Sequence, residues 1–504
     1  MNDLVLLLCS TADCVIYSNE NSQEETTMLG DMKPFRMAGN LYFVGTFKAS
    51  SHLIDTGDGL ILIDTGYEET AEVVIESVTE LGFDVRDIRY ILHSHGHCDH
   101  TDGTPRMVEV SGAETFLAKA DLKYLKGWTP DHDLQDGDVI TLGNTQILCL
   151  STPGHTEGTT SFFFNVEDGG KVYRAGMFGG AGTNQLKKDF LDQQGCSWLN
   201  RGLFFSSIDR LKKEHVDIFV GNHAWNNRTR ENYELMLTAD HNPFIDDSRW
   251  LPFLEKCERD LWTVMLQDSH THFVNYAHRG ASEYTPENTM LAFYTGLYMG
   301  ANGIETDVQR TKDGVLVLFH DDTILRLTGA EGSVCDYTLD ELRAFSFEKN
   351  GLKDQVVVFE DFLRQFGWRD LRFAIEIKQR GIETEIADML RKYDMGGKCV
   401  VTSFKFDCIE KIRQYASELK VGWLKKEFSE AEEQQLLAIG GEEICPFAPE
   451  LTPEMTQRWH RMGLNVRGWG VRDEEIMRSV CACMADGMTV NFPDRLSAYL
   501  QHRE

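Results

Sequence analysis

The chain has 504 residues, enough for roughly three domains of average size or two large ones. Its composition, with 42% hydrophobic and 26% charged residues, is typical of a globular protein and excludes the disordered and fibrous classes. The formal net charge of −30 repels phosphate groups, so we expect neither nucleic acid nor an anionic membrane surface as a main partner.

Residues 1–30 are expected to form a leader outside the folded domains. The opening run MNDLVLLLCS is apolar but much shorter than the roughly 20 residues that span a bilayer. Asp3 stands where a signal peptide has basic residues, and a lipid-anchored interpretation of Cys9 meets the same lack of positive charge. The 12 cysteines include no CxxC pair, so we interpret them as mostly reduced thiols. We therefore expect a cytoplasmic protein without a membrane span.

Residues 31–269 are predicted to form a first domain with a framework of β-strands. Apolar runs that end in Gly, His or turn residues occur at 40–47, 59–66, 88–94, 146–155, 160–166, 171–178 and 216–225. Apolar residues at helical spacing fill 67–82, which stops at Gly82, and 248–269, which ends the domain. Reactive residues lie just past the strand ends, the usual position of a site on a rigid scaffold.

The strongest chemical signal in this domain is the pattern HxHxDH over 95–100. Two histidines two positions apart can bind one metal ion, and the Asp–His pair after them can bind a second. Two further histidines, His155 and His223, each follow a strand. Three ligands per metal leave a position for a water that ionises near neutral pH and attacks as hydroxide. His93 and Cys98 lie outside this register, and we interpret them as packing or supporting residues.

The segments LILIDTG, HGHCDH, TPGHTEG and GNHAW resemble motifs of the metallo-β-lactamase-fold hydrolases, over roughly residues 30–268. The resemblance implies an αββα sandwich, about two zinc ions and a supporting role for Asp64. It implies that the first zinc is held by His95, His97 and His155, and the second by Asp99, which we also expect to be catalytic, with His100 and His223. The fold does not name the substrate, since this family cleaves lactams, thioesters, lactones and phosphodiesters.

This chain departs from the family pattern at one position. Many members have a bridging aspartate in a Gly-Asp pair, whereas the matching stretch here is Ala175-Gly176-Met177. Without that carboxylate the site resembles either the branch in which hydroxide alone bridges the metals or a singly occupied site. We expect Met177 to face the metals rather than the apolar core.

Residues 270–504 are predicted to form a second domain of alternating strands and helices, which is typical of βαβ units and a parallel sheet. Strand candidates lie at 273–277, 302–308, 373–378, 399–404, 420–424, 443–447, 466–471 and 487–492. Eight such strands predict a closed (β/α)₈ barrel, that is, a TIM barrel. The run 315–321 follows its predecessor after a link too short for a helical crossover, so we expect an antiparallel hairpin there.

Three carboxylates are predicted to converge inside this barrel. Glu305 and Asp307 are two apart on a strand and therefore face the same side, and Glu376 lies on the next parallel strand. Such carboxylates repel one another unless a cation lies among them. All-oxygen ligation favours Ca²⁺ or Mg²⁺ over zinc.

Further groups suited to phosphodiester cleavage accompany the carboxylates. Arg279 and Lys378 can neutralise the charge that develops on a phosphoryl group, together with the metal. His278 and His320 can act as a general acid and a general base.

The run 278–329 closely resembles the glycerophosphodiester phosphodiesterases, and the resemblance continues through SVCDYTLDELRAF, EIK and NFPDRL. It implies hydrolysis of glycerophosphodiesters to sn-glycerol 3-phosphate and an alcohol. It implies that His278 and His320 are the acid–base pair, that Glu305, Asp307 and Glu376 hold the metal, that Arg279 and Lys378 contact the phosphate, and that Glu287 and Asn288 shape the site. Two departures, Arg326-Leu327-Thr328 and Asn491, are expected to lie outside the catalytic core. Trp469 either stacks on the glycerol side of the substrate or belongs to the core.

Two functional hypotheses remain. In the first, a zinc hydrolase and a glycerophosphodiesterase are fused in one enzyme. In the second, only the barrel is catalytic, and the first domain is a metal-binding or oligomerisation module. A nuclease of the same zinc fold conflicts with the net charge and with the absence of a basic, aromatic-interleaved stretch. We expect small phosphodiesters as substrates, and the oligomeric state stays open.

Overall fold

The computed structural model describes residues 32–501, apart from the side chains of 269–271, so the expected leader at 1–30 lies outside the described residues. The chain divides into two compact units. The first holds the described residues up to Thr183 together with Leu203–Asp260, and the second holds Asn184–Gly202 and the described residues from Leu261 onward. A single boundary at 269/270 was predicted. In the structure, residues 184–202 belong to the second unit, and the division at 260/261 falls within the helix Trp250–Thr271.

The first unit contains two β-sheets. One has the order β1 (Phe35–Ala38), β2 (Leu41–Phe43), β3 (His52–Asp55), β4 (Leu60–Ile63), β5 (Ile88–Leu92), β6 (Glu114–Leu117) and β7 (His132–Asp133). The other has the order β12 (Ile218–Val220), β11 (Lys171–Met177), β10 (Thr160–Asp168), β9 (Thr145–Ser151) and β8 (Val139–Leu142). Strands β4, β5 and β6 are parallel, so their carboxyl ends lie at one edge of the first sheet.

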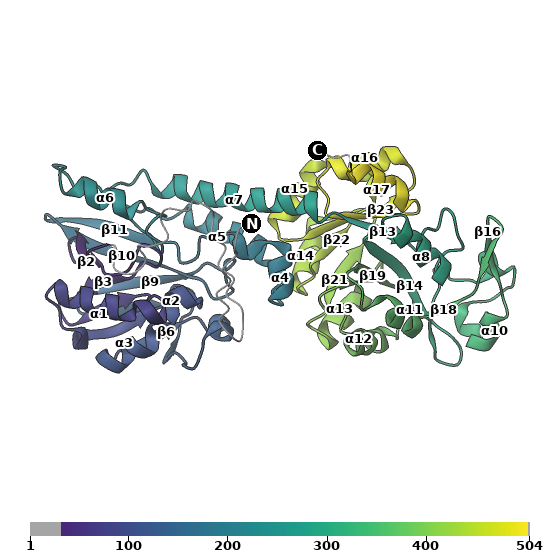
Figure 1. Cartoon of the computed structure of the whole chain (residues 1–504), viewed down its shortest axis with the longest axis horizontal. Helices are drawn as coiled ribbons and strands as arrows, with labels where there is room; N and C mark the ends of the chain where they lie inside the picture. Colours follow the sequence, from purple (N-terminus) through teal and green to yellow (C-terminus); the bar gives the residue numbers. More distant parts are fainter. Residues whose placement is uncertain (1–31, 502–504) are drawn as a thin grey trace, which may run out of the picture. The chain divides into compact units, whose positions relative to one another are not determined.

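Side chains that alternate along the strands divide this unit into four layers. Phe162 of β10 belongs to the core between the two sheets. Leu62 of β4 packs with Val74 of α1 (Ala71–Glu80) on the outer face of the first sheet, where α3 (Thr104–Ser111) also lies. Phe163 of β10 contacts Trp250 of α7 (Trp250–Thr271) on the outer face of the second sheet, with ring centroids 6.1 Å apart. These layers, visible in Figure 1, form the predicted αββα sandwich.

The second unit is built on eight parallel strands that close on themselves. Their order is β13 (Val274–His278), β14 (Gly303–Arg310), β19 (Arg372–Ile377), β20 (Cys399–Ser403), β21 (Lys420–Leu424), β22 (Glu443–Cys445), β23 (Asn465–Val471) and β24 (Gly487–Val490). Strand β13 pairs with both β14 and β24, which completes the barrel. The predicted (β/α)₈ fold is therefore confirmed.

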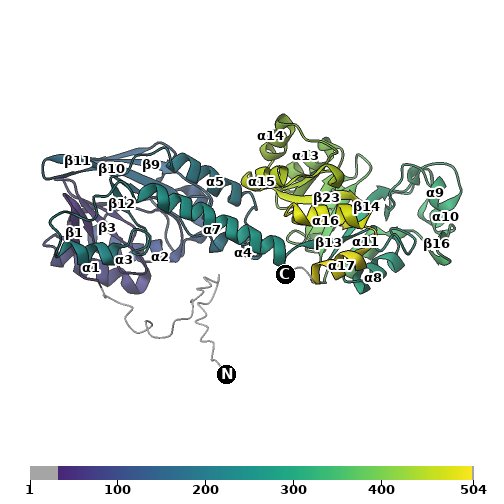
Figure 2. The same ribbon diagram turned by 90° about the horizontal axis from the view of Figure 1, so that it is seen from above.

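Helices follow most of these strands and surround the barrel, as Figure 2 shows for the helices that it labels. They are α8 (Met290–Tyr298), α11 (Phe359–Phe366), α12 (Glu383–Lys392), α13 (Phe406–Tyr415), α14 (Glu430–Ala438), α15 (Pro453–Arg461), α16 (Glu474–Ala482) and α17 (Pro493–Gln501). The expected hairpin is present, because β15 (Leu316–Leu318) pairs antiparallel with β14. Within residues 32–501, no helix combines the length and apolar character that crossing a bilayer requires.

Residues 184–202, with α4 (Lys188–Gln193), pack against the amino-terminal ends of the barrel strands. The Lys188 ammonium lies 2.7 Å from a carboxylate oxygen of Asp486, which directly precedes β24. Ser197 donates a hydrogen bond to Glu442, which directly precedes β22. Asp192 pairs with Lys420, the first residue of β21. The segment thus belongs to the barrel through polar contacts that no local sequence pattern marks.

The Lys188–Asp486 pair offers a test of this packing. Lys188→Met leaves the buried Asp486 carboxylate with His460 and a backbone N–H as its partners. We expect the free energy of unfolding to fall by about 3 kcal/mol, because removal of one partner of a buried ion pair leaves the other charge buried without its cation. Urea denaturation of the full chain measures this change. Lys353→Met is the matched control, because its exposed pair with Glu348 contributes less than about 1 kcal/mol. Equal effects of the two substitutions would contradict the assignment.

Candidate active sites

Six ligand-type side chains of the first unit meet beyond the carboxyl ends of its strands. His95 and His97 follow β5, Asp99 and His100 lie in α2 (Cys98–Thr101), His155 follows β9 and His223 follows β12. The ligand atoms of His95, His97 and His155 all lie within 4.8 Å of one another, and so do those of His95, Asp99 and His100. His223 Nε2 lies 3.7 Å from an Asp99 oxygen. The structure therefore brings these six predicted residues together, with His95 common to both close groups.

Backbone carbonyls orient several of these imidazoles. The Nδ1 atom of His95 lies 2.9 Å from the carbonyl oxygen of Gly179, and that of His155 lies 2.8 Å from the carbonyl oxygen of Gly182. His223 Nδ1 makes the same kind of contact with the carbonyl of Lys48. A carbonyl only accepts hydrogen bonds, so Nδ1 carries the proton in each ring and the Nε2 lone pair is available to a metal.

Asp64 supports the histidine cluster through hydrogen bonds to residues next to it. It directly follows β4 and has a left-handed backbone with φ of 59°. Its carboxylate accepts hydrogen bonds from the backbone N–H and the hydroxyl of Ser94, both at 2.7 Å, and lies 2.8 Å from His100 Nδ1. It therefore holds both the loop that carries His95 and the ring of His100.

Burial and charge set the protonation of this centre. Burial lowers the pKa of His97 to about 4 and that of His155 to about 3, so both rings are neutral. His100 behaves differently, because Asp99 and Asp64 outweigh its burial and raise its pKa to about 10. Its buried Nε2 atom has no hydrogen-bond partner. This Nε2 atom lies 3.3 Å from an Asp99 oxygen, and a zinc-type cation bound there would displace a proton from His100. The neutral imidazoles and the carboxylate around it are ligand types that zinc accepts.

Asp121 is a supporting residue that the sequence analysis missed. Its buried carboxylate accepts hydrogen bonds from the backbone N–H groups of Gly96 and Gly158 and from the hydroxyl of Thr156. It thereby ties the loop of His97 to the loop of His155. Burial raises its pKa to about 6. Its partners are remote in sequence, so no motif reveals it.

Met177 is buried in the core between the two sheets, which contradicts the expectation that it faces the metals. It ends β11 and pairs in register with Phe162 and Val220 on the neighbouring strands. His93 also lies outside the ligand cluster, with its ring nitrogens 3.2 Å from the His100 carbonyl and from the Thr104 hydroxyl. Cys98 is half-buried at the start of α2.

Met177→Asp distinguishes a core position from a metal-facing one. The substitution buries a charge between apolar side chains, so we expect the free energy of unfolding to fall by several kcal/mol, on the order of 3–5. Chemical denaturation gives this value. Val172→Asp is the control, because Val172 lies on the same strand and is 65% exposed. Tighter metal binding with unchanged stability would show that Met177 faces the metals after all.

The three predicted carboxylates of the barrel converge as the strand alternation requires. Glu305 and Asp307 lie on β14, and Glu376 lies beside Asp307 in the register of β19. Their ligand atoms all lie within 4.8 Å of one another, and all three side chains are buried.

Two cationic side chains border this cluster. Arg279 Nε lies 3.3 Å from an Asp307 oxygen, and the Arg279 backbone N–H, at a left-handed φ of 58°, donates to Glu305. Lys378 Nζ lies 2.8 Å from Glu376 and 3.8 Å from Asp307. Asn288 donates a hydrogen bond of 2.9 Å to Asp307. Cationic groups and carboxylates thus share one edge of the barrel.

The pKa values at this cluster reflect excess negative charge. Burial and the neighbouring carboxylates raise the pKa of Glu305 well above its usual range and that of Glu376 to about 7. Arg279 and Lys378 outweigh burial at Asp307 and lower its pKa to about 2. One Asp307 oxygen, Oδ1, is buried without a hydrogen bond. The raised pKa values of Glu305 and Glu376 reflect a shortage of positive charge around them, and this donor set fits a hard divalent cation.

The two predicted acid–base histidines have different partners. His278 Nδ1 lies 2.6 Å from Asn491 Oδ1, and its Nε2 lies 3.8 Å from Glu305. His320 Nδ1 lies 2.7 Å from an oxygen of Asp321. Burial lowers the pKa of His278 to about 3 and also lowers that of His320. The expectation that Asn491 lies outside the catalytic core is therefore wrong.

Arg326 is also part of this site, contrary to expectation. It donates hydrogen bonds to Glu287 and to Asp321, while Glu287 accepts another from Arg279. The resulting ion-pair network joins four carboxylates, Glu287, Asp307, Asp321 and Glu376, to three cations, Arg279, Arg326 and Lys378, and Glu305 accepts a hydrogen bond from the Arg279 backbone N–H. With all five carboxylates ionised, two negative charges would remain, which is the charge that one divalent cation neutralises.

Trp469 lies at the carboxyl end of β23 in a half-buried aromatic cluster. Its ring centroid is 5.0 Å from that of Phe404 and 4.9 Å from that of Phe447, and its indole N–H donates to the carbonyl of Lys425. The Lys378 ammonium lies 5.9 Å from the Phe404 ring. Phe404 thus lies between Trp469 and Lys378.

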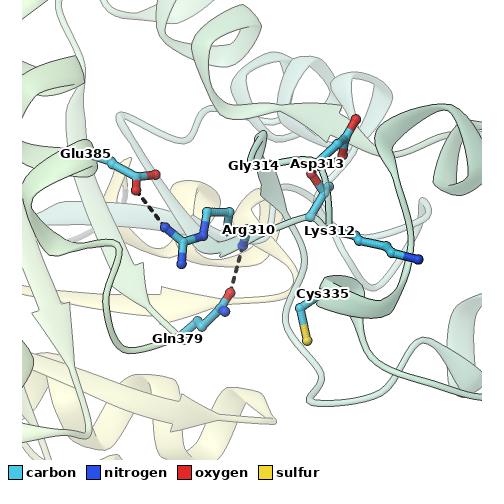
Figure 3. A pocket seen from close by; sticks show the side chains of 8 residues that line it. Arg310, Lys312, Asp313, Gly314, Cys335, Gln379 and Glu385 are labelled. Atoms are coloured by element: carbon cyan, nitrogen blue, oxygen red, sulfur yellow. Dashed lines mark hydrogen bonds and ion pairs between the residues drawn. The ribbon is translucent and has the colours of Figure 1, made fainter.

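A separate cavity of about 600 Å³ opens where β14 ends (Figure 3). Arg310, Lys312, Cys335, Gln379 and Glu385 contribute to its lining. Arg310 faces this cavity but is 2.6 Å from Glu385, so its charge is already paired. None of the predicted catalytic residues is among the lining residues.

Comparisons with known proteins agree with this arrangement. The glycerophosphoryl diester phosphodiesterase family model matches residues 278–495. The glycerophosphodiester phosphodiesterase of Caldanaerobacter subterraneus subsp. tengcongensis is 30% identical over 229 residues, which cover 44% of this chain and 94% of that protein. The chain belongs to the glycerophosphoryl diester phosphodiesterase family. The enzyme of the same name from Bacillus altitudinis is 28% identical over 232 residues, covering 44% of this chain and 95% of that protein.

The first unit matches a different family. The metallo-beta-lactamase superfamily model matches residues 44–169. Among solved structures, native FEZ-1 metallo-beta-lactamase from Legionella gormanii is 30% identical, with a TM-score of 0.44, covering 48% of this chain and 98% of that protein. The two family models confirm the predicted resemblance of the two parts of the chain to two hydrolase families.

Proposed function

We propose that the barrel hydrolyses glycerophosphodiesters to sn-glycerol 3-phosphate and an alcohol. The observation that carries this proposal is the buried cluster of Glu305, Asp307 and Glu376, whose three carboxylates outnumber the two neighbouring cations, Arg279 and Lys378. These carboxylates repel one another, and a divalent cation bound among them would remove the repulsion. The two cationic side chains can in addition interact with an anionic substrate. Family membership supports the same activity.

The proposed mechanism assigns each residue a role. Glu305, Asp307 and Glu376 would hold a Ca²⁺ or Mg²⁺ ion, which would supply positive charge next to the phosphoryl oxygens. Arg279 and Lys378 bind those oxygens and stabilise the charge that develops on them. His278 and His320 move protons, one from the attacking nucleophile and one to the leaving alcohol. Glu287 and Asn288 position Arg279 and Asp307, and Trp469 stacks on the glycerol side of the substrate.

Loss of either histidine tests this mechanism. In the full chain with saturating Mg²⁺ or Ca²⁺, we expect His278→Ala and His320→Ala each to lower the rate of glycerophosphocholine hydrolysis by about 10²–10⁴-fold. Glu376→Gln is expected to respond to excess metal, because its defect is metal affinity, whereas the histidine variants should not respond. Released glycerol phosphate is the readout, and chelation should abolish it in the unmodified chain.

His215→Ala serves as the control for the histidine variants, because His215 is exposed and pairs only with Asp217 among the ion pairs described for it. A metal-loaded, folded chain that releases no glycerol phosphate from a broad panel of glycerophosphodiesters would refute the proposed function.

We further propose that the first unit is a dinuclear zinc hydrolase of unassigned substrate. His95, His97 and His155 would hold one ion, and Asp99, His100 and His223 the other. Zinc bound there would supply a hydrolytic nucleophile at neutral pH. The alternative is a metal-binding or oligomerisation module without catalysis. The assigned sets of three protein ligands per ion favour the enzyme, because structural zinc sites usually have four protein ligands and catalytic sites three.

Zinc content tests the ligand assignment. The chain purified from zinc-rich medium should carry about two zinc ions, and Asp99→Ala should lose about one of them, because it removes a carboxylate from one ligand set. Metal analysis per chain gives the count. His132→Ala is the control, since His132 is an exposed histidine paired with Glu114. A zinc-free unmodified chain would refute the assignment and leave the barrel proposal untouched.

A further inference from the structure

Arg326 makes two paired contacts with two carboxylates at the same time. Its Nε and Nη2 atoms lie 2.6 Å and 3.1 Å from the two oxygens of Asp321. Its Nη1 and Nη2 atoms lie 2.8 Å and 2.6 Å from the two oxygens of Glu287. The planar guanidinium therefore uses both of its edges, and Nη2 takes part in each pair. A lysine ammonium, which is a single point of charge, cannot reproduce this geometry.

Each of the two carboxylates also contacts a residue of the proposed mechanism. Asp321 contacts His320 Nδ1 at 2.7 Å, and Glu287 accepts a hydrogen bond of 2.9 Å from Arg279 Nη1. An ionised carboxylate only accepts hydrogen bonds, so the proton of His320 lies on Nδ1 and its Nε2 is the atom left for proton exchange. Arg326 thus connects a group that moves a proton to a group that binds phosphate.

The two connected residues come from separate parts of the chain. Arg279 directly follows β13, and His320 lies beyond β15 in the hairpin grafted onto the barrel. Within the described residues, β15 pairs with β14 and β18 (Val357–Val358) and not with β13. Among the described contacts, the Asp321–Arg326–Glu287 chain is the side-chain link between the two loops. The distance between a proton donor and its phosphate depends on such links.

We propose that Arg326 is a positioning residue that sets the place of His320 relative to Arg279. This inference rests on the proposed phosphodiesterase function. The ligand atoms of Glu287, His320 and Asp321 also lie within 4.8 Å of one another, as a metal site would require. The Arg326 guanidinium already supplies the positive charge among them, so this group holds an arginine in place of a second ion.

The exposure of Arg326 separates an effect on activity from an effect on stability. Its side chain is 49% exposed, so solvent screens its ion pairs and their contribution to folding is small. Orientation is a different matter, because a displacement of about 1 Å between reacting groups costs about 100-fold in rate. Arg326 should therefore control turnover while having little influence on the melting temperature.

The test compares Arg326→Lys and Arg326→Ala with the unmodified full chain, using glycerophosphocholine and saturating Mg²⁺. We expect kcat to fall by roughly 10- to 100-fold in both variants, with the melting temperature unchanged. Lysine retains the charge, so equal losses in the two variants identify the two-edged geometry as the cause. The control is Arg391→Lys, because Arg391 is 40% exposed and makes a comparable two-bond pair with Glu418 away from this site. It should keep the kcat of the unmodified chain.

Chemical rescue provides a readout that a merely structural role would not move. Guanidinium ion at non-denaturing concentration should restore kcat of Arg326→Ala several-fold, whereas methylammonium should not, because only guanidinium offers paired N–H donors. The unmodified chain should not respond to either ion. Wild-type kcat in Arg326→Lys would overturn the inference and leave the phosphodiesterase function intact. An inactive unmodified chain would overturn the proposed function, and this inference with it.

Discussion

Burial of negative charge is the constraint on which the barrel site depends. Glu305, Asp307 and Glu376 are close together in a place that water reaches poorly, so their repulsion is strong. The surrounding groups reduce that repulsion, because Arg279 and Lys378 form ion pairs with Asp307 and Asn288 donates a hydrogen bond to it. The raised pKa values of Glu305 and Glu376 show that both carboxylates take up a proton more readily than usual in this cluster. A divalent ion bound there would take the place of such protons, so the cluster suits the proposed metal site and phosphate site.

The first unit gathers its predicted metal ligands with much less negative charge, because most of them are histidines. Burial lowers the pKa values of His95, His97 and His155, so this site gathers neutral nitrogen ligands and needs no counter-ions for them. Only Asp99 contributes a ligand charge, and Asp64 holds His100 from below. Nitrogen-rich ligation favours zinc, whereas the all-oxygen set of the barrel favours Ca²⁺ or Mg²⁺. The different metals proposed for the two units therefore follow from ligand chemistry alone.

Local patterns in the sequence predicted the fold and the ligand clusters, and long-range contacts explain the errors. Glu305 and Asp307 could be placed on one face because a strand repeats every two residues. Asn491 and Arg326 escaped prediction because their partners, His278 and Glu287, come from other loops. Met177 was misplaced for another reason. A family motif identifies a position in the sequence, whereas the alternation of β11 turns this particular side chain into the core between the sheets.

The two ends of the barrel show how a structural charge network differs from a functional one. At the amino-terminal end, Asp486 has Lys188 as its cation, and Asp192 has Lys420. Between the ends, the buried Arg467 and Glu443 pair at 2.8 Å. In these networks each carboxylate has a cation of its own, so none of them requires a ligand for its charge balance. At the carboxyl-terminal end the carboxylates outnumber the cations by two, and either protons or a bound cation can balance that excess. The incomplete pairing, more than the number of charges, therefore supports the proposal that this end binds metal and substrate.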